Sequence, residues 1–172
     1  MIKFLLYILI IAGASISGML KAKSFDNRVF HLQDFISTLK ILESEMKYLM
    51  DPLPEIFKRI QHIKRGMTSM LFQTTWEMLQ EDQTHNFSQC WEKAVYTVYN
   101  ESSLTREDKE IIVDFGMNIG KTDIENQLNI FSRTSSLLEG QVKEAIEHRT
   151  TKGKMYKSLG VAIGILVVII LI

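Results

Sequence analysis

The chain has 172 residues, and its 20 Lys and Arg residues are balanced by 20 Asp and Glu residues, so its formal net charge at pH 7 is zero. The central segment has no Lys/Arg cluster that would form a phosphate-binding face, so no nucleic-acid partner is predicted. The single cysteine, Cys90, cannot form an intramolecular disulfide, and the 4 histidines are not at metal-ligand spacing, so no metal or other cofactor is predicted.

Two uncharged apolar blocks, residues 4–20 and 159–172, lie at the ends of the chain. About 20 apolar residues usually span a bilayer and about 17 are near the lower limit, so the first block is long enough and the second is short. Lys154 and Lys157 help the second block, because their long side chains can reach back to the bilayer surface. We therefore predict transmembrane helices at residues 1–22 and 158–172, and a domain at residues 23–157 between them.

The first block also has features of a secretory signal, because Lys3 precedes it and small residues such as Ala12 and Ser15 lie near its end. Lys21 and Lys23 follow the block directly, as in a stop-transfer flank, which favours a retained anchor. The alternative is cleavage of the signal, which would release a secreted or surface-exposed helical binding module.

Basic residues adjoin both blocks on the side of the central segment, and such residues stay on the cytoplasmic side of a membrane. They are Lys21, Lys23 and Arg28 after the first block, and Arg149, Lys152, Lys154 and Lys157 before the second. The pattern predicts a hairpin in the cell membrane, with both termini outside and the central domain in the cytoplasm.

Small residues recur four positions apart in both blocks. Gly160 and Gly164 form such a pair in the second block, and the first block has Gly13 with Ser17 and Ala14 with Gly18. Small residues at this spacing allow two helix backbones to approach closely, so the blocks are predicted to pack together or against another membrane protein. The alternative is the ordinary glycine content of membrane helices.

Between the blocks, apolar residues recur at intervals of three and four, which predicts helices. The expected helices cover residues 28–50, 54–63, 67–79, 88–99 and about 105–116, and a last helix runs from Thr122 into the second block with Gly153 as its only weak point. Thr105 with Asp108 and Thr122 with Glu125 are the predicted caps, and Gly116 and Gly120 are expected to loosen the end of the fifth helix. The predicted fold is an all-α, six-helix bundle.

Two polar residues fall within the apolar stripes. Glu43 lies on the stripe of the first bundle helix while Glu45 points away from it, and Gln127 lies on the stripe of the last helix. One interpretation is that Glu43 is paired with a neighbouring Arg, Lys or Tyr, because an unpaired buried charge is costly. The other is that Glu43 is an acidic spot where a partner docks. Gln127 is interpreted as a core amide with its hydrogen bonds satisfied.

No arrangement of residues at a catalytically useful spacing was found, so the chain is not predicted to be an enzyme. The segment "FGMNIGKTD" contains two glycines before a lysine, but Gly116 and Gly120 are separated by three residues and no strand precedes them. It therefore lacks the spacing and the context of a phosphate-binding loop. A membrane-tethered enzyme remains the least favoured function.

Three segments together, "FISTLKILESEMKYLMDPLPEIFKRI", "GMNIGKTDIENQ" and "GKMYKSLGVAIGILVVIILI", resemble the stage III sporulation protein AB family of endospore-forming bacteria. The resemblance covers essentially the whole chain. It implies a soluble domain similar to the cytoplasmic helical domains of the type II secretion platform protein. It also implies a place among the eight proteins of a secretion-like complex that joins mother cell and forespore.

The expected partners under this resemblance are the secretion-type ATPase of the complex, its other membrane components and the lipid bilayer. The family has no catalytic residues to transfer to this chain. Its motifs mark positions that we interpret as fold-defining or partner-docking: Glu43, Glu45, Pro52, Leu53, Pro54, Gly116, Gly120, Asp123 and Gln127.

Overall fold

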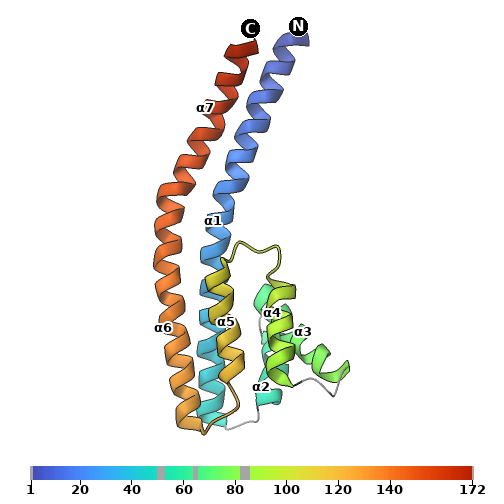
Figure 1. Ribbon diagram of the computed structural model, residues 1–172, viewed down its shortest axis with the longest axis vertical. Coiled ribbons are helices and arrows are strands. Elements are labelled where there is room, and N and C mark those ends of the chain that lie inside the picture. Colours follow the sequence, from blue (N-terminus) through green and yellow to red (C-terminus); the bar gives the residue numbers. More distant parts are fainter. Residues whose placement is uncertain (1, 50–52, 64–65, 82–85, 172) are drawn as a thin grey trace. The chain divides into compact units, whose positions relative to one another are not determined.

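The computed structural model describes residues 2–49, 53–63, 66–81 and 86–171, and every regular element within these ranges is a helix (Figure 1). The elements are α1 (Ile2–Leu49), α2 (Leu53–Ile63), α3 (Met67–Glu81), α4 (Phe87–Val98), α5 (Arg106–Asn118), α6 (Ile124–His148), a π-helical turn (Arg149–Gly153) and α7 (Lys154–Leu171). The predicted all-α fold is confirmed.

The chain forms two compact units, which we describe separately. The terminal unit comprises Met1–Val29 and Lys143–Ile172, and the central unit comprises Phe30–Val142. These units are defined by packing and not by a bilayer, so the predicted boundaries of the membrane segments, 1–22 and 158–172, stay predictions.

Helix α1 differs from the sequence-based expectation of an anchor followed by a separate helix from residue 28. It continues without interruption from Ile2 to Leu49. The sequence becomes polar after residue 20, but it contains no proline or glycine between residues 19 and 49. Only the composition changes there, and nothing in the backbone preferences would end the helix.

Side-chain caps determine where the later helices begin. The predicted pair at α5 is confirmed, because Thr105 N donates to Asp108 Oδ2 at 2.8 Å and Asp108 N donates to Thr105 Oγ1 at 3.2 Å. The predicted pair at α6 is wrong. Asp123 caps this helix instead, with its Oδ1 accepting from the backbone N–H of Asn126 at 3.0 Å. Asp is a better N-cap than Thr, and it lies directly before the first helical residue.

The core of the central unit is built on the predicted apolar face of α1. Leu32, Phe35, Ile36, Leu39, Leu42 and Met46 are all buried. Trp91 of α4 lies among four other aromatic rings, those of Phe57, Phe72, Phe87 and Phe115, with ring centroids 5.4 to 6.2 Å away. Its Nε1–H donates to the Ile112 carbonyl at 2.8 Å, so the indole is held by both packing and a hydrogen bond.

Gly116 allows this arrangement. It was expected to loosen the end of α5, but it is buried within the helix, and a Cβ at this position would collide with the Trp91 ring. Gly120 has a different role, because its φ of 81° is in the left-handed region that glycine adopts without strain. Gly120 therefore turns the chain after α5, while Gly116 lets α4 and α5 approach each other.

A buried polar network links α1, α3 and the end of α4. Thr68 Oγ1 donates to Asp34 Oδ2 at 2.5 Å, and the Tyr99 hydroxyl lies 3.4 Å from Thr68 Oγ1. Because the single Thr68 hydroxyl proton points to Asp34, Tyr99 must be the donor in the second bond. Burial raises the pKa of Tyr99, which keeps this donor protonated.

Candidate functional site

In the terminal unit, the N-terminal part of α1 and helix α7 lie side by side and run in opposite directions (Figure 1). A Cβ on Gly18 would be 2.6 Å from the Tyr156 carbonyl oxygen, and one on Gly160 would be 2.8 Å from the Ala14 carbonyl oxygen. A Cβ on Gly164 would be 3.3 Å from the Cβ of Ala14. The two backbones therefore meet at small residues.

Four of the six small residues singled out in the sequence lie at this contact: Ala14, Gly18, Gly160 and Gly164. The other two lie outside it. A Cβ on Gly13 would meet nothing within 4 Å, and Ser17 is exposed, with its hydroxyl donating to the Gly13 carbonyl at 3.0 Å. The sequence offered both pairs equally, because spacing alone does not tell which side of α1 faces α7.

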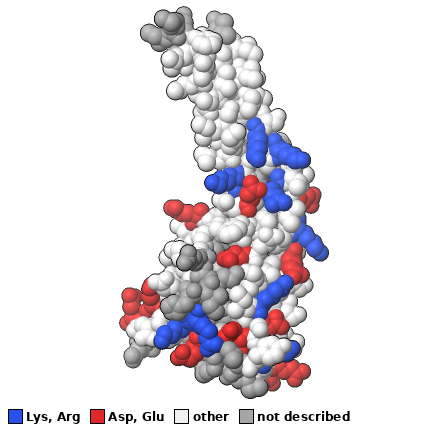
Figure 2. Space-filling view, turned by 180° about the vertical axis from the view of Figure 1, so that it is seen from behind, with Lys and Arg blue, Asp and Glu red and all other residues white. Residues whose placement is uncertain are grey.

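The outer surface of these helices is apolar. By length and composition, both helices could cross a membrane. In the most apolar 18-residue stretch of each helix, only 6% and 11% of the residues are buried. Large apolar side chains such as Phe4, Leu9, Leu166 and Ile170 are exposed. In Figure 2 the apolar stretch is almost free of charge, and Lys and Arg side chains gather at its end. The core helix of a water-soluble protein would instead bury this surface.

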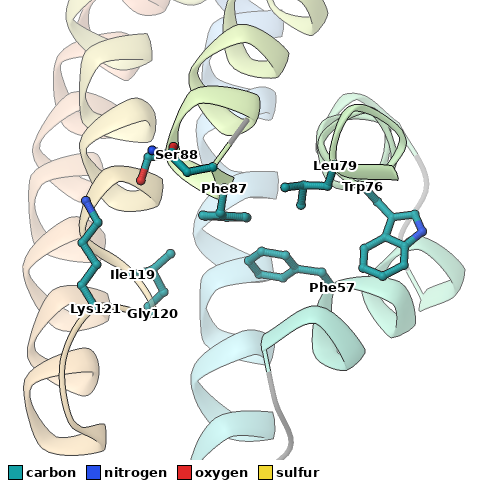
Figure 3. Close-up of a pocket in the computed structure, with 9 residues that line it drawn as sticks. Phe57, Trp76, Leu79, Phe87, Ser88, Ile119, Gly120 and Lys121 are labelled. Carbon is teal, nitrogen blue, oxygen red and sulfur yellow. The ribbon is translucent and has the colours of Figure 1, made fainter. Parts of the chain in front are cut away.

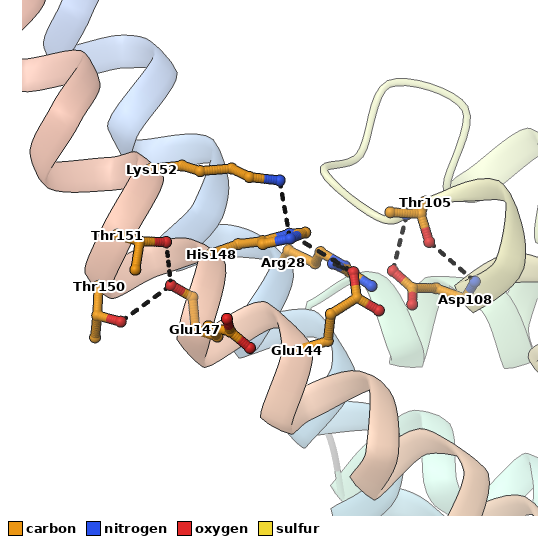
Figure 4. Close-up of polar contacts among 9 residues, drawn as sticks. All are labelled: Arg28, Thr105, Asp108, Glu144, Glu147, His148, Thr150, Thr151 and Lys152. Carbon is orange, nitrogen blue, oxygen red and sulfur yellow. Dashed lines mark hydrogen bonds and ion pairs between the residues drawn. The ribbon is translucent and has the colours of Figure 1, made fainter.

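A polar cluster lies at the charged end of the terminal unit (Figure 4). The buried Arg28 side chain, 5% exposed, pairs with Glu144 at 3.2 Å. His148 Nδ1 lies 3.6 Å from the same carboxylate, and its Nε2 lies 2.9 Å from Lys152 Nζ. Because a lysine ammonium can only donate, Nε2 is the acceptor and Nδ1 carries the proton. The cluster compensates a buried positive charge where α1 meets α6.

The π-helical turn follows this cluster, at the point where Gly153 was predicted to weaken the last helix. The hydroxyls of Thr150 and Thr151 both donate to the Glu147 carbonyl, at 3.0 and 2.7 Å. A π turn holds one more residue than an α turn. Buried positions show this extra residue, since Phe131, Leu138 and Ala145 are seven apart, Gly153 and Gly160 are seven apart, and Ala145 and Gly153 are eight apart.

Deletion of Thr150 is expected to convert the π turn into regular α-helix while keeping α7 packed on α1, because the spacing from Ala145 to Gly153 becomes seven. The readout is a disulfide between cysteines at positions 14 and 164 in a Cys90→Ser background, whose Cβ atoms are close enough to bridge. An alanine inserted after Thr150 is the control, since it rotates α7 by about 100° and should abolish the cross-link. Loss of the cross-link on deletion would contradict this role of the π turn.

In the central unit, the acid that forms an ion pair is not the one expected from the helix projection. Glu45, 21% exposed, binds Arg59 of α2 at 2.7 Å, while Glu43 is half-buried. The projection placed Glu45 away from the stripe of α1, but α2 folds back on that side. The paired role therefore belongs to Glu45, and Glu43 keeps the docking interpretation.

The remaining motif positions have varied surroundings. Pro52 lies outside the described residues, and Leu53 and Pro54 form the first turn of α2. Gln127 does not have the fully satisfied amide that we expected. Its Nε2 donates to the Thr122 carbonyl at 2.7 Å, but its buried Oε1 has no hydrogen-bond partner in the part of the chain that the structure describes.

Sequence reasoning missed an apolar pocket of about 440 Å³ in the central unit (Figure 3). Its walls come from α2, α3, the start of α4 and the turn after α5, and they include Phe57, Trp76, Leu79, Phe87, Ile119, Gly120 and Lys121. These residues are distant in sequence, so no local pattern reveals the pocket. Within the described ranges, no group of three or more His, Cys, Asp or Glu side chains could hold a metal ion.

Comparison with known sequences and structures identifies the family. The sequence profile of the family described as stage III sporulation protein AB matches residues 3–172. The chain belongs to this family. It is 25% identical over 171 residues to the stage III sporulation protein AB of Bacillus subtilis (strain 168), and the alignment covers 99% of both chains.

A solved structure of a stage III sporulation protein AB has a similar fold, with a TM-score of 0.64 at 22% identity. The alignment covers 73% of this chain and 98% of the solved chain. The resemblance inferred from the three sequence segments is thus confirmed at the level of family and fold.

Proposed function

We propose that the chain is a non-enzymatic membrane platform component of a sporulation-specific, secretion-like channel between mother cell and forespore, and that it docks the cytosolic ATPase of that complex. The observation that carries this proposal is the antiparallel pair of apolar helices, packed through Ala14, Gly18, Gly160 and Gly164. Each helix continues along the chain, at the same end of the pair, into a folded helical unit. Membership of the sporulation family supports the biological setting.

The charge distribution supports the orientation of the platform. Five exposed lysines lie at the end of the apolar pair that connects to the central unit, at positions 21, 23, 152, 154 and 157, whereas the sequence has one lysine, Lys3, near the opposite end. Positive residues are retained on the cytoplasmic side. Both termini then lie outside the mother-cell membrane, and the central unit lies in the cytoplasm, where a cytosolic ATPase can reach it.

Two features of the central unit could contact such a partner. The apolar pocket can accept an apolar side chain, and Trp76 at its wall is partly exposed. Tryptophan is enriched among the residues that dominate binding energy at interfaces. Glu43 offers a carboxylate on α1 that can be altered without breaking the Glu45–Arg59 ion pair. Asp123 is a poorer choice for a docking test, because it caps α6.

The test is capture of the ATPase by the full-length chain in detergent micelles. Wild-type protein is expected to retain the ATPase, and Glu43→Lys or Trp76→Ala is expected to weaken retention by about tenfold, through charge reversal or loss of an apolar anchor. Glu92→Lys on the exposed side of α4 is the matched control. Failure of the wild-type protein to retain the ATPase would refute the docking function. Undiminished retention by both variants would show that neither Glu43 nor Trp76 belongs to the docking surface.

The alternative, a binding module released by signal cleavage, is favoured only by the position of the first apolar block near the N-terminus. Cleavage near residue 20 would remove Gly18 and Ala14, and so would expose the backbone of α7 at Gly160. N-terminal sequencing of the membrane-extracted protein separates the two functions. We expect Met1–Leu20 to be retained, and a mature protein beginning after it would establish the secreted form.

A further inference from the structure

The lysines at the end of the apolar helix pair lie at one height along it. Gly18 of α1 contacts Gly160 of α7. Further toward the central unit, Ala22 of α1 is buried, and so is Gly153 directly before α7. Further along the pair, an ion pair joins Arg28 of α1 to Glu144 of α6. Between these two contacts lie Lys21 and Lys23 on α1, and Lys154 and Lys157 on α7, all of them exposed.

Most acidic residues of this region lie beside arginine or histidine side chains. Glu144 accepts from Arg28 and lies beside His148, and Asp26 lies 3.9 Å from Arg149. In the described part of the chain, no ion pair joins Lys21, Lys23, Lys154 or Lys157 to an acid. Residues 21–29 and 143–157 together hold eight Lys and Arg and three Asp and Glu, a net charge of +5.

Aromatic rings from the two sides of the helix pair meet at the level of these lysines. Phe25 of α1 stacks on Tyr156 of α7, with ring centroids 6.0 Å apart, and meets His148 edge-on at 6.4 Å. Tyrosine is enriched at the boundary between hydrocarbon and headgroups, because its ring is apolar and its hydroxyl is polar. The four lysines thus lie at the level of this aromatic contact along the helices, at the depth where lipid phosphates would lie if the apolar pair spans a bilayer.

We propose that Lys21, Lys23, Lys154 and Lys157 form a basic belt that binds the phosphate headgroups of anionic phospholipids in the cytoplasmic leaflet. Clusters of four to eight basic residues directly beside a membrane helix attract anionic lipids, and each exposed lysine adds to the attraction. Here the belt draws on both ends of the chain, because α1 and α7 pack against each other at this level. The inference rests on the membrane insertion that the proposed function requires.

The experiment measures lipid retained by the full-length chain. Protein in detergent micelles with equal phosphatidylglycerol and phosphatidylcholine is examined by native mass spectrometry, which counts each bound lipid. Wild-type protein is expected to retain more phosphatidylglycerol than phosphatidylcholine. In the fourfold Lys→Gln variant at positions 21, 23, 154 and 157, the ratio of bound phosphatidylglycerol to bound phosphatidylcholine should be about tenfold lower. A fourfold Lys→Gln variant at the exposed positions 40, 47, 58 and 93 removes the same charge from the central unit and should behave like wild type.

Several outcomes would overturn the inference. These are equal retention of both lipids by wild type, an unchanged preference in the first variant, or an equal loss in both variants. Displacement of phosphatidylglycerol by excess inorganic phosphate would indicate a free-anion site instead of a lipid site. A chain that stays soluble without detergent would refute membrane insertion itself, and with it the proposed function. The variants change exposed side chains, and a helical circular dichroism spectrum like that of wild type verifies their folding.

Discussion

Replacement of Gly116 by alanine is expected to lower the free energy of unfolding by about 1–3 kcal/mol, as overpacking of a tight core does. The new Cβ would collide with the indole of Trp91. The indole has no free direction in which to move, because four aromatic rings surround it and its N–H is bonded to the Ile112 carbonyl. Larger residues such as leucine should prevent folding of the central unit.

The measurement is denaturant unfolding of the full-length chain in micelles, followed by tryptophan fluorescence. Gly140→Ala is the matched control, since Gly140 also lies in a helix and a Cβ there would meet nothing within 4 Å. The control should gain about 0.5–1 kcal/mol from helix propensity. Equal stabilisation of both variants would show that Gly116 is not required for the contact with Trp91.

Replacement of Gly160 by leucine is expected to separate the two apolar helices. A side chain at this position meets the Ala14 carbonyl at 2.8 Å and the Cα of Gly18 at 3.1 Å, and both are backbone atoms that cannot rotate away. Separation costs the close backbone contact on which association of helices in a bilayer depends. Cross-linking between cysteines at positions 14 and 164 should fall by about tenfold, because overpacking costs of this kind are about 1–3 kcal/mol and about 1.4 kcal/mol is a factor of ten.

Gly13→Leu is the control for this change, because Gly13 lies in the same part of α1 and points away from α7. It should leave the cross-link at the wild-type level. Under the proposed function, Gly160→Leu should also reduce the yield of heat-resistant spores, while Gly13→Leu should not. Equal cross-linking in the two variants would indicate that the glycines of α7 do not hold the pair together.

Helix positions could be predicted well from the sequence, and their connections less well. The intervals of apolar residues located α2 to α6 closely, and Thr105 with Asp108 gave the start of α5 correctly. The continuity of α1 was missed, because a change from apolar to polar composition resembles a boundary although helix propensity continues through it. The cap of α6 was placed one residue early, since Thr122 and Asp123 both fit a capping sequence.

The candidate site was predictable only in part. The glycine pair at residues 160 and 164 was visible as a pattern, and so were the basic flanks. The choice of Ala14 and Gly18 over Gly13 and Ser17 depends on which side of α1 meets α7. The pairing of Glu45 instead of Glu43 depends on the path of α2, and the pocket depends on four segments that are far apart in sequence.

The sequence by itself determined the helical class, the two apolar ends and the family of this protein, because these depend on residue types a few positions apart and on motifs that persist along the chain. Only the tertiary structure decided that Gly116 accommodates Trp91, that a π turn absorbs one residue between Ala145 and Gly153, and that the basic segments from the two ends of the chain pack against each other. The physical reason is that close packing and electrostatic clustering depend on which faces of distant segments meet, and a helical pattern of one segment carries no record of its neighbour.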